Sequence, residues 1–384
     1  MKEIVLGFVT SFFVVLLTTP SLIKVAKMKK LVDDPNEERK KHRKSTPTIG
    51  GIIIFAASIF AYALWFPSDN LSYFGSLHHF SESVNDFKFL ISAAILLFFI
   101  GVKDDIIGIA PMKKLLGHVI VGFILVVMAD IRIMGMHGVF DIQEIPYWAS
   151  VLLSVFTYVV VVNAINLIDG SDGLAAGTGF ICSVFYGMWF YGTYQYDLSM
   201  MAFVLAGSLG GFLLFNFSPA KIFMGDSGSL FIGAFVFVMS MKCIETDTRL
   251  LDGWTENVSS AVFALCVLAY PLVDTLRVFT LRILKGRSPF SADRNHIHHQ
   301  LIDSGFSHAF TALYLYLIVI VVPLVSLAFK GYSATIVFFS MLLISFALVH
   351  TVFIFRFWKA RGAKIPPHAE ESQSLPASGS SEPV

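Results

Sequence analysis

The stretch YWASVLLSVFTYVVVVNAINLIDGSDGLAAGTGFICSVFYGMWFY, residues 147–191, decides the fold class of this chain. It holds two apolar runs, at 147–163 and 173–191, separated by a short segment that contains Asp169 and Asp172. The hydrocarbon layer of a membrane is about 30 Å thick, and a helix of about 20 mainly apolar residues crosses it. The stretch therefore predicts two membrane-spanning helices that meet at one face of the membrane, with polar residues at the turn.

The composition of the whole chain supports the same interpretation. Of the 384 residues, 55% are apolar and only 14% are charged, and the mean hydropathy is +0.72. Soluble domains are about one quarter charged, so these values disfavour a water-soluble enzyme, a disordered scaffold and a nucleic-acid-binding protein. The three cysteines, Cys182, Cys243 and Cys266, all lie in apolar runs and are interpreted as core residues rather than as disulfide partners or metal ligands.

The same length criterion predicts an all-α, multi-pass integral membrane protein with about eleven transmembrane helices. The predicted spans are 3–23, 48–66, 88–102, 115–131, 147–163, 173–191, 198–217, 228–243, 258–280, 310–329 and 332–355. An odd number of spans places the two ends of the chain on opposite sides of the membrane.

The placement of charge sets the predicted orientation. By alternation of the spans, 22 of the 28 Lys and Arg residues fall on one side of the membrane, and loops rich in Lys and Arg face the cytoplasm. We therefore expect the N-terminus outside and the C-terminus in the cytoplasm. Residues 1–364 form a single transmembrane domain in this interpretation, and the Ser/Pro-rich residues 365–384 form a disordered cytoplasmic tail.

Carboxylates gather in three motifs at the predicted cytoplasmic ends of spans. The motifs are FFIGVKDDIIGI with Asp104 and Asp105, NAINLIDGSDGLAAG with Asp169 and Asp172, and FNFSPAKIFMGDSGSLFIG with Asp226. Ionisable groups at membrane depth are costly and mark functional sites, and carboxylates with substrate phosphates suit Mg²⁺. Structural roles stay open beside this one: a water-facing helix end for the Asp pair, and helix capping for Asp172 and for Asp226.

A second group of candidate residues is cationic and lies in DTLRVFTLRILKGRSPFSADRNHIHHQL, residues 274–301. Guanidinium groups bind phosphate oxygens in pairs, and histidines hydrogen-bond to phosphate, whereas the loop lacks the thiolates of a typical zinc site. In the first cytoplasmic loop, TPTIGG, which includes Thr48, ends in a glycine pair that lets the backbone approach a ligand closely. The members of the cationic group are Arg277, Arg282, Lys285, Arg287, Arg294, His296, His298 and His299.

The motifs KDD, NLIDGSDGLAAG, FMGDSGSLFIG and GRSPFSADRNHIHHQL, in this order, resemble those of the polyprenyl-phosphate N-acetylhexosamine-1-phosphate transferases, from about Val32 to Leu301. The resemblance implies an enzyme of the bacterial cytoplasmic (inner) membrane whose active site faces the cytoplasm. It implies transfer of a sugar 1-phosphate from a UDP-N-acetylhexosamine donor to undecaprenyl phosphate with release of UMP, and Mg²⁺, or Mn²⁺ in its place, as cofactor. A homodimer is one of the arrangements left open, and no nucleic-acid partner is expected.

The resemblance also implies roles for individual residues. Asp226 maps onto the metal ligand, and Asp104 onto the group that deprotonates the acceptor phosphate. The other catalytic positions are Asp105, Asp169, His298 and His299. Spacing does not decide which of two adjacent lysines lies at the acceptor phosphate. The substrate-binding positions are Asn166, Asp172, Asn216, Phe223, Arg294, His296, Lys113, Lys114 and Thr48.

The order of the histidines bears on the donor sugar. The segment from His296 to Gln300 reads HIHHQ, which resembles the branch that starts O-antigen, enterobacterial common antigen or teichoic acid synthesis, and this branch implies UDP-GlcNAc as donor. The TPTIGG wording leans toward the peptidoglycan branch, so another UDP-N-acetylhexosamine or UDP-MurNAc-pentapeptide stays an alternative. An ion-coupled transporter is an alternative from another class, and it is disfavoured because the acids cluster at one membrane face rather than near the midplane.

Overall fold

The computed structural model describes residues 1–29, 31–33, 46–66, 77–249, 251, 253–288 and 294–362. Over these ranges the chain is helical apart from two short strands, β1 (Val32–Asp33) and β2 (Thr46–Pro47), which pair antiparallel. The predicted tail at 365–384 and the domain boundary at 364 lie outside the described residues.

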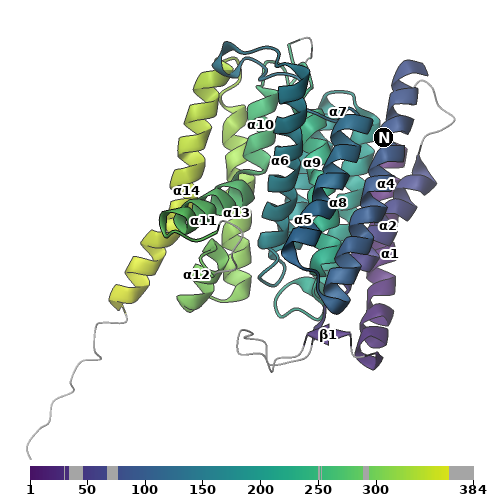
Figure 1. The fold of residues 1–384 in the computed structure, drawn as a ribbon, viewed down its shortest axis with the longest axis vertical. Helices are drawn as coiled ribbons and strands as arrows, with labels where there is room; N and C mark the ends of the chain where they lie inside the picture. The colour runs from purple at the N-terminus through teal and green to yellow at the C-terminus, as the bar shows by residue number, and fades with distance from the viewer. Residues whose placement is uncertain are drawn as a thin grey trace, which may run out of the picture.

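The described helices follow one another through the chain. The first half holds α1 (Lys2–Met28), α2 (Gly50–Trp65), α4 (Leu77–Ile107), α5 (Pro111–Phe123) with a π-helical turn (Ile124–Met128), a 3₁₀ turn (Val139–Asp141) and α6 (Tyr147–Leu167). The second half holds α7 (Leu174–Gly192), α8 (Tyr196–Asn216), α9 (Gly225–Ile244), α10 (Ser260–Val267), α11 (Ala269–Leu284), α12 (Ile297–Asp303), α13 (His308–Leu327) and α14 (Ala334–Gly362). Most of them run side by side as one bundle (Figure 1).

The bundle is that of a multi-pass membrane protein. Within the described residues, seven helices are long and apolar enough to cross a membrane: α1, α6, α7, α8, α9, α13 and the Ala334–Ile354 part of α14. The bent pair α10 and α11 would make an eighth span. Each of the eleven predicted intervals overlaps a helix, so the fold class is confirmed, whereas the count of eleven spans and the orientation stay predictions.

One predicted span, 258–280, is wrong as a single straight helix. The segment breaks at Leu268 into α10 and α11, which are bent by 71° relative to each other. Pro271 explains the break, because proline has no N–H with which to bond the carbonyl four residues earlier, at Val267. Figure 1 shows the consequence: α11 lies across the bundle rather than along it.

Helix α9 is the almost wholly buried centre of the bundle, and its neighbours include α2, α4, α6, α7 and α10. The C-terminal half of α4 lies close to the first turn of α9. A Cβ added to Gly101 would lie only 2.4 Å from Cα of Ser227. Small residues let membrane helices pack at such short range. This packing brings the acids that follow Gly101 on α4 next to the acid at the start of α9.

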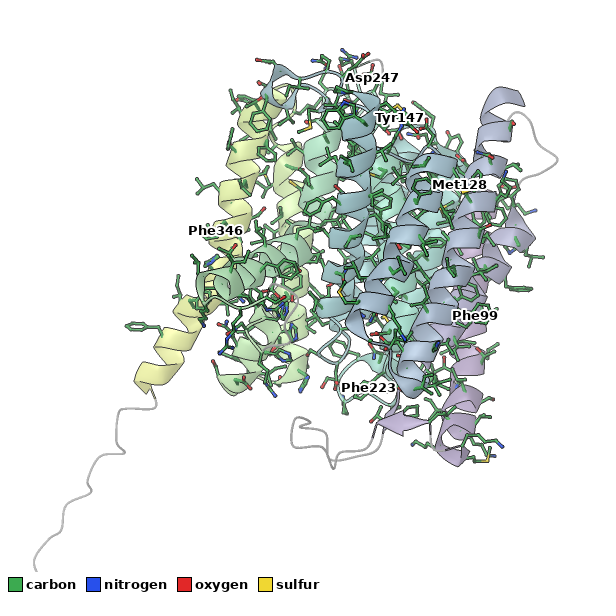
Figure 2. The ribbon with its side chains drawn as sticks, viewed as in Figure 1. Phe99, Met128, Tyr147, Phe223, Asp247 and Phe346 are labelled. Atoms are coloured by element: carbon green, nitrogen blue, oxygen red, sulfur yellow. The ribbon has the colours of Figure 1, made fainter. Side chains whose placement is uncertain are left out.

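The polar motifs share one end of the bundle. Figure 2 places Phe223, just before α9, at the end opposite Tyr147 and Asp247. The N-terminus lies toward the Tyr147 end and α14 finishes toward the Phe223 end (Figure 1). Because α6 begins at Tyr147, its C-terminus and the loop that carries Asp169 also reach the Phe223 end.

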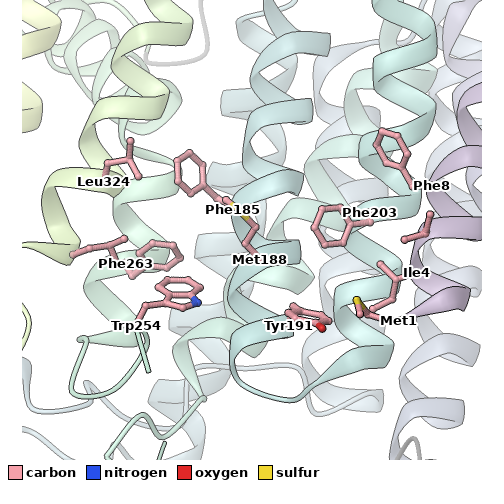
Figure 3. Close-up of a pocket in the computed structure, with 12 residues that line it drawn as sticks. Met1, Ile4, Phe8, Phe185, Met188, Tyr191, Phe203, Trp254, Phe263 and Leu324 are labelled. Atoms are coloured by element: carbon pink, nitrogen blue, oxygen red, sulfur yellow. The ribbon is translucent and has the colours of Figure 1, made fainter. Parts of the chain in front are cut away.

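A separate apolar cavity of about 650 Å³ lies near the N-terminus (Figure 3). Its walls come from α1, α7, α8, α10 and α13 and from the loop before α10, and they include Ile4, Phe185, Trp254 and Leu324. Among the described residues, neither a charged side chain nor any of the predicted site residues lines it. The chemistry predicted from the sequence therefore lies elsewhere.

Candidate active site

A cluster of charged and polar side chains joins α4, α5, α6 and α9. The ammonium of Lys114 on α5 donates to Oδ2 of Asp226 on α9 and, over 2.9 Å, to Oδ2 of Asp104 on α4. Asn166 at the end of α6 donates through Nδ2 to Oδ1 of Asp226, at 2.8 Å. Four helices thus bring two carboxylates and one cation together, and the three motifs with acids predicted from the sequence do meet.

Asn166 also reaches Ser229, one turn into α9. Its Nδ2 lies 2.8 Å from the Ser229 hydroxyl oxygen, so one amide group contacts both Asp226 and Ser229. Ser229 was not among the predicted residues. Its position three residues after an acid, on the same helical face, is the signal that could have found it.

Asp105 has both of its oxygens engaged by backbone. Oδ1 accepts from the N–H of Asp226 at 2.7 Å, and Oδ2 accepts from the N–H of Ser227 at 3.1 Å. The first N–H groups of a helix have no partner within that helix, and a carboxylate there complements the positive end of the helix dipole. Asp105 therefore holds the start of α9 in place, and its predicted catalytic role stays a prediction.

The adjacent lysines predicted near the acceptor phosphate differ in the structure. Lys114 points into the cluster with 17% of its side chain exposed, whereas Lys113 is exposed at the surface. Asp226 does not cap α9: it is the second residue of the helix, and no side chain caps it. The capping alternative for Asp226 is therefore wrong, which leaves its carboxylate to the cluster.

The TPTIGG segment packs against the same region through its backbone. Phe223 donates its N–H to the carbonyl of Pro47 at 2.7 Å, and Gly50 donates to the carbonyl of Phe223 at 3.0 Å. Gly51 donates to the carbonyl of Met224 at 2.8 Å. The glycine pair thus approaches the segment before α9, and the predicted approach to a ligand stays a prediction. Thr48 lies half-buried between these contacts.

Asp169 lies half-buried in the loop after α6 and close to the other acids. Burial raises the pKa of the Asp169 carboxyl well above its ordinary value, and the negative charges of Asp226 and Asp105 raise it further. A hydrogen bond from the backbone of Gly225 acts in the opposite direction. Asp169 is therefore the acid of this site that most readily keeps a proton near neutral pH.

The histidine motif comes against this loop. His298 is fully buried, and a Cβ on Gly170 would lie 2.6 Å from its Nε2, so glycine is what allows the contact. Burial lowers the pKa of His298 well below its ordinary value. Burial and the nearby charge of Arg294 lower the pKa of His299 to about 4. Both imidazoles are therefore neutral near pH 7, which makes them hydrogen-bonding groups rather than cations.

Two other predicted residues shape the loop before α9. Asn216 donates through Nδ2 to the carbonyl of Ile222 at 2.9 Å, and Oδ2 of Asp172 accepts from the N–H of Ala220 at 3.1 Å. Helix α7 begins at Leu174 without a side-chain cap, so the prediction that Asp172 caps it is wrong. Asp172 instead ties two loops together. Phe223 is half-buried at the end of this loop (Figure 2).

Asp274 on α11 is a candidate residue that the sequence analysis missed. It is 0% exposed, and its carboxylate lies 3.0 Å from Nδ1 of His296 and 3.1 Å from Arg277. His296 is therefore buried against an acid, while Arg294 pairs with Asp303 on the exposed side of α12. The signal was present in the sequence, because Asp274 is a carboxylate inside the predicted span 258–280, and such residues mark functional sites.

The fold and the site together define a multi-pass membrane protein that gathers carboxylates, a lysine and neutral histidines at one end of its bundle, an arrangement suited to phosphate groups. The model of the family described as glycosyl transferase family 4 matches residues 87–244. The chain is also similar to curated proteins. A probable undecaprenyl-phosphate N-acetylglucosaminyl 1-phosphate transferase of Bacillus subtilis (strain 168) is 32% identical over 88% of this chain and 87% of its own length.

Two further relatives come from other bacteria. The undecaprenyl-phosphate alpha-N-acetylglucosaminyl 1-phosphate transferase of Escherichia coli O157:H7 is 32% identical over 74% of this chain and 72% of its own. The decaprenyl-phosphate N-acetylglucosaminephosphotransferase of Mycobacterium leprae is 32% identical over 73% and 72%. The chain belongs to glycosyl transferase family 4, among the polyprenyl-phosphate N-acetylhexosamine-1-phosphate transferases, as its motifs predict.

Proposed function

We propose that this protein transfers GlcNAc 1-phosphate from UDP-GlcNAc to undecaprenyl phosphate, giving undecaprenyl-pyrophosphoryl-GlcNAc and UMP. The observation that carries the proposal is the cluster of Asp104, Lys114, Asn166 and Asp226, which four helices build at one end of the bundle. The names of the relatives support GlcNAc as the sugar and a polyprenyl phosphate as the acceptor.

The reaction needs one bond to form and one to break. An oxygen of the lipid phosphate attacks the β-phosphorus of the donor, and the bond from that phosphorus to the oxygen shared with UMP breaks. Catalysis of phosphoryl transfer rests on positioning and charge stabilisation, which Lys114 supplies beside the reacting phosphates. A phosphate monoester is mostly a dianion at pH 7, because its second pKa is about 6, and Asp104 accepts the remaining proton. We favour this direct attack over a covalent enzyme intermediate.

On the donor side, the neutral imidazoles of His298 and His299 donate hydrogen bonds to the pyrophosphate. Their contact with the Gly170 loop places them beside Asp169. A neutral donor loses less free energy of hydration on entering a buried site than a cation does, because desolvating a charge costs more than desolvating a dipole. The nucleotide is thereby held without a second cluster of charge.

Mg²⁺ is the proposed cofactor, with Asp226 as its ligand and Mn²⁺ as a substitute. The site fits a divalent cation, since the ammonium of Lys114 already contacts Asp226 and Asp104. Among the described residues no three His, Cys, Asp or Glu are arranged to hold a metal, and Mg²⁺ is usually bound by one or two carboxylates plus substrate phosphates. When bound, the ion neutralises charge that develops on the pyrophosphate.

The proposed setting is the bacterial inner membrane, with eleven spans, the N-terminus outside and the site facing the cytoplasm. Two observations support it: the excess of Lys and Arg on the predicted cytoplasmic side and the polar motifs that share one end of the bundle (Figure 2). In this setting the product starts a cell-envelope polysaccharide of the O-antigen, enterobacterial common antigen or teichoic acid kind.

The test is turnover by the purified full chain in detergent with undecaprenyl phosphate, Mg²⁺ and one donor at a time. We expect UMP release and a lipid-linked sugar pyrophosphate with UDP-GlcNAc, and at least about tenfold slower turnover with UDP-GalNAc or UDP-MurNAc-pentapeptide. EDTA should abolish the rate, and Mg²⁺ or Mn²⁺ should restore it. Faster turnover of either other donor would replace the proposed sugar, and no UMP with any donor would overturn the reaction.

A further inference from the structure

Asp274 is a buried acid on α11, the helix that lies across the bundle (Figure 1). Its exposed fraction is 0%, and an ionised carboxylate buried without partners is costly enough that it would not stay charged. Arg277, one turn further along α11, donates to Oδ1 of Asp274 at 3.1 Å. The pair is therefore a buried acid and base on a helix whose neighbours are apolar, and a role for it must come from what else it contacts.

What the pair contacts is the start of the histidine motif. Oδ2 of Asp274 lies 3.0 Å from Nδ1 of His296, and Oδ1 accepts from the N–H of Ile297 at 3.1 Å. Arg277 also donates to the carbonyl of Asn295. Three consecutive residues, at the point where α12 begins, are thus held by two side chains of α11.

The contact extends from His296 into the site through neighbouring rings, the first pair stacked and the second tilted. The rings of His296 and His298 are 5.8 Å apart at 18°, and those of His298 and His299 are 4.2 Å apart. Nε2 of His298 faces Gly170 in the loop of Asp169. Within the described ranges no protein group hydrogen-bonds to Nε2 of His296 or to either nitrogen of His298. Buried polar atoms are rarely left without a hydrogen-bond partner, which points to a partner from outside the protein, such as a ligand.

We propose that Asp274 is a positioning residue for the nucleotide-sugar side of the reaction, and this inference rests on the proposed function. By accepting a hydrogen bond from Nδ1–H, Asp274 orients the His296 ring and keeps its proton on Nδ1, which leaves Nε2 pointing away from Asp274. Through the N–H of Ile297 it also fixes where the imidazole row meets the Gly170 loop. Carboxylates hold histidines in this way at other sites, where losing the carboxylate costs about 10- to 100-fold.

The variant that separates these effects is Asp274→Asn. The amide keeps an acceptor oxygen for Ile297 and Arg277, but its NH₂ group donates to Nδ1 and forces the proton of His296 onto Nε2. We expect kcat/KM for UDP-GlcNAc to fall about 10- to 100-fold, while the KM for undecaprenyl phosphate stays within about twofold. The matched control is Asp247→Asn, an exposed acid paired with Arg249 at the other end of the bundle, which should change neither constant.

A double-mutant cycle with His296→Ala distinguishes positioning from general stabilisation. If Asp274 acts through His296, the double variant should be no more than about threefold slower than His296→Ala alone, because coupled residues are not additive. The inference would be overturned if the losses in kcat/KM of the two single variants multiplied in the double variant. An equal rise in the KM values for UDP-GlcNAc and undecaprenyl phosphate would also overturn it. Should Asp274→Asn fail to fold, Arg277→Lys enters the same cycle, since a lysine cannot bond Asp274 and the Asn295 carbonyl in a fork.

The affinity for UDP, measured by calorimetry on the same variants, keeps the two proposals apart. A wild-type chain that binds UDP but transfers no GlcNAc would end the proposed function, and the cycle would then be read from UDP affinity, where the same coupling is expected. An active wild-type chain whose cycle is additive by both readouts would end the inference about Asp274 alone.

Discussion

In the proposed function, the carboxylate cluster and the histidine row both bind phosphate groups, but they differ in charge and in burial. In the cluster, Lys114 sits between Asp104 and Asp226, and these charged side chains are partly exposed. In the row, His298 is fully buried and His299 half-buried, both with lowered pKa values, and Asp274 contacts the row from behind, at His296. The comparison indicates that the cluster acts through charge and the row through hydrogen-bond geometry.

The largest expected effect comes from removing charge in the cluster. Asp226→Asn keeps the size of the side chain and its acceptor oxygen for Asn166, but it removes the negative charge that Lys114 contacts and that the proposed Mg²⁺ requires. We expect UMP release to fall by about 10³-fold or more. Asp247→Asn, at the other end of the bundle, should keep the wild-type rate. A turnover rate of Asp226→Asn within about tenfold of wild type would mean that the charge of the cluster does not drive catalysis. The proposed difference between the cluster and the histidine row would then be wrong.

The adjacent lysines offer a matched pair for the next prediction. Lys114→Met leaves Asp104 and Asp226 facing each other without the cation, so we expect a loss of about 10²-fold in kcat/KM for undecaprenyl phosphate. Lys113→Met should cost at most about threefold, because the Lys113 ammonium is solvent-exposed and exposed charges are screened. Measured side by side as initial rates of UMP release, equal losses in the two variants would contradict the assignment of Lys114 as the acceptor-side cation.

The comparison also separates what the sequence could and could not predict. Apolar runs of about 20 residues report on membrane helices directly, and each predicted interval does overlap a helix. The acids of the three motifs meet as expected, because their positions at the ends of helices were readable. The choice between Lys113 and Lys114 could not be predicted from the sequence. Adjacent residues on a helix differ only in the face they present, and packing decides which face is buried.

Contacts between distant segments were beyond the sequence for a similar reason. Asp172 precedes a helix and was open to a capping role, yet its carboxylate accepts from Ala220 in a loop that follows another helix. Asp274 lies in a run that predicts a single apolar span. The sequence does not predict its contact with His296, because that contact and the break at Pro271 arise from tertiary packing. Local pattern predicts elements, whereas the partner of a buried polar group is set by the whole fold.

The smallest expected effect tests the neutrality of His299 in the histidine row. The pKa of His299 in the folded chain is about 4, below its ordinary value of 6.5, so the unfolded chain binds more protons between these pH values. Folding stability from this group is therefore complete above about pH 6.5 and is lost as the pH falls toward about 4. His299→Gln removes that titration, and its melting temperature should fall less than that of the wild type between pH 7 and pH 5, by about 1–3 °C. Asp169, whose pKa is raised by burial, contributes in the opposite direction in both proteins and cancels in the difference. Scanning fluorimetry in detergent without substrates measures this difference in melting temperature. An equal or larger fall in His299→Gln would mean that His299 is charged in the folded chain. Both regions would then bind phosphate through charge.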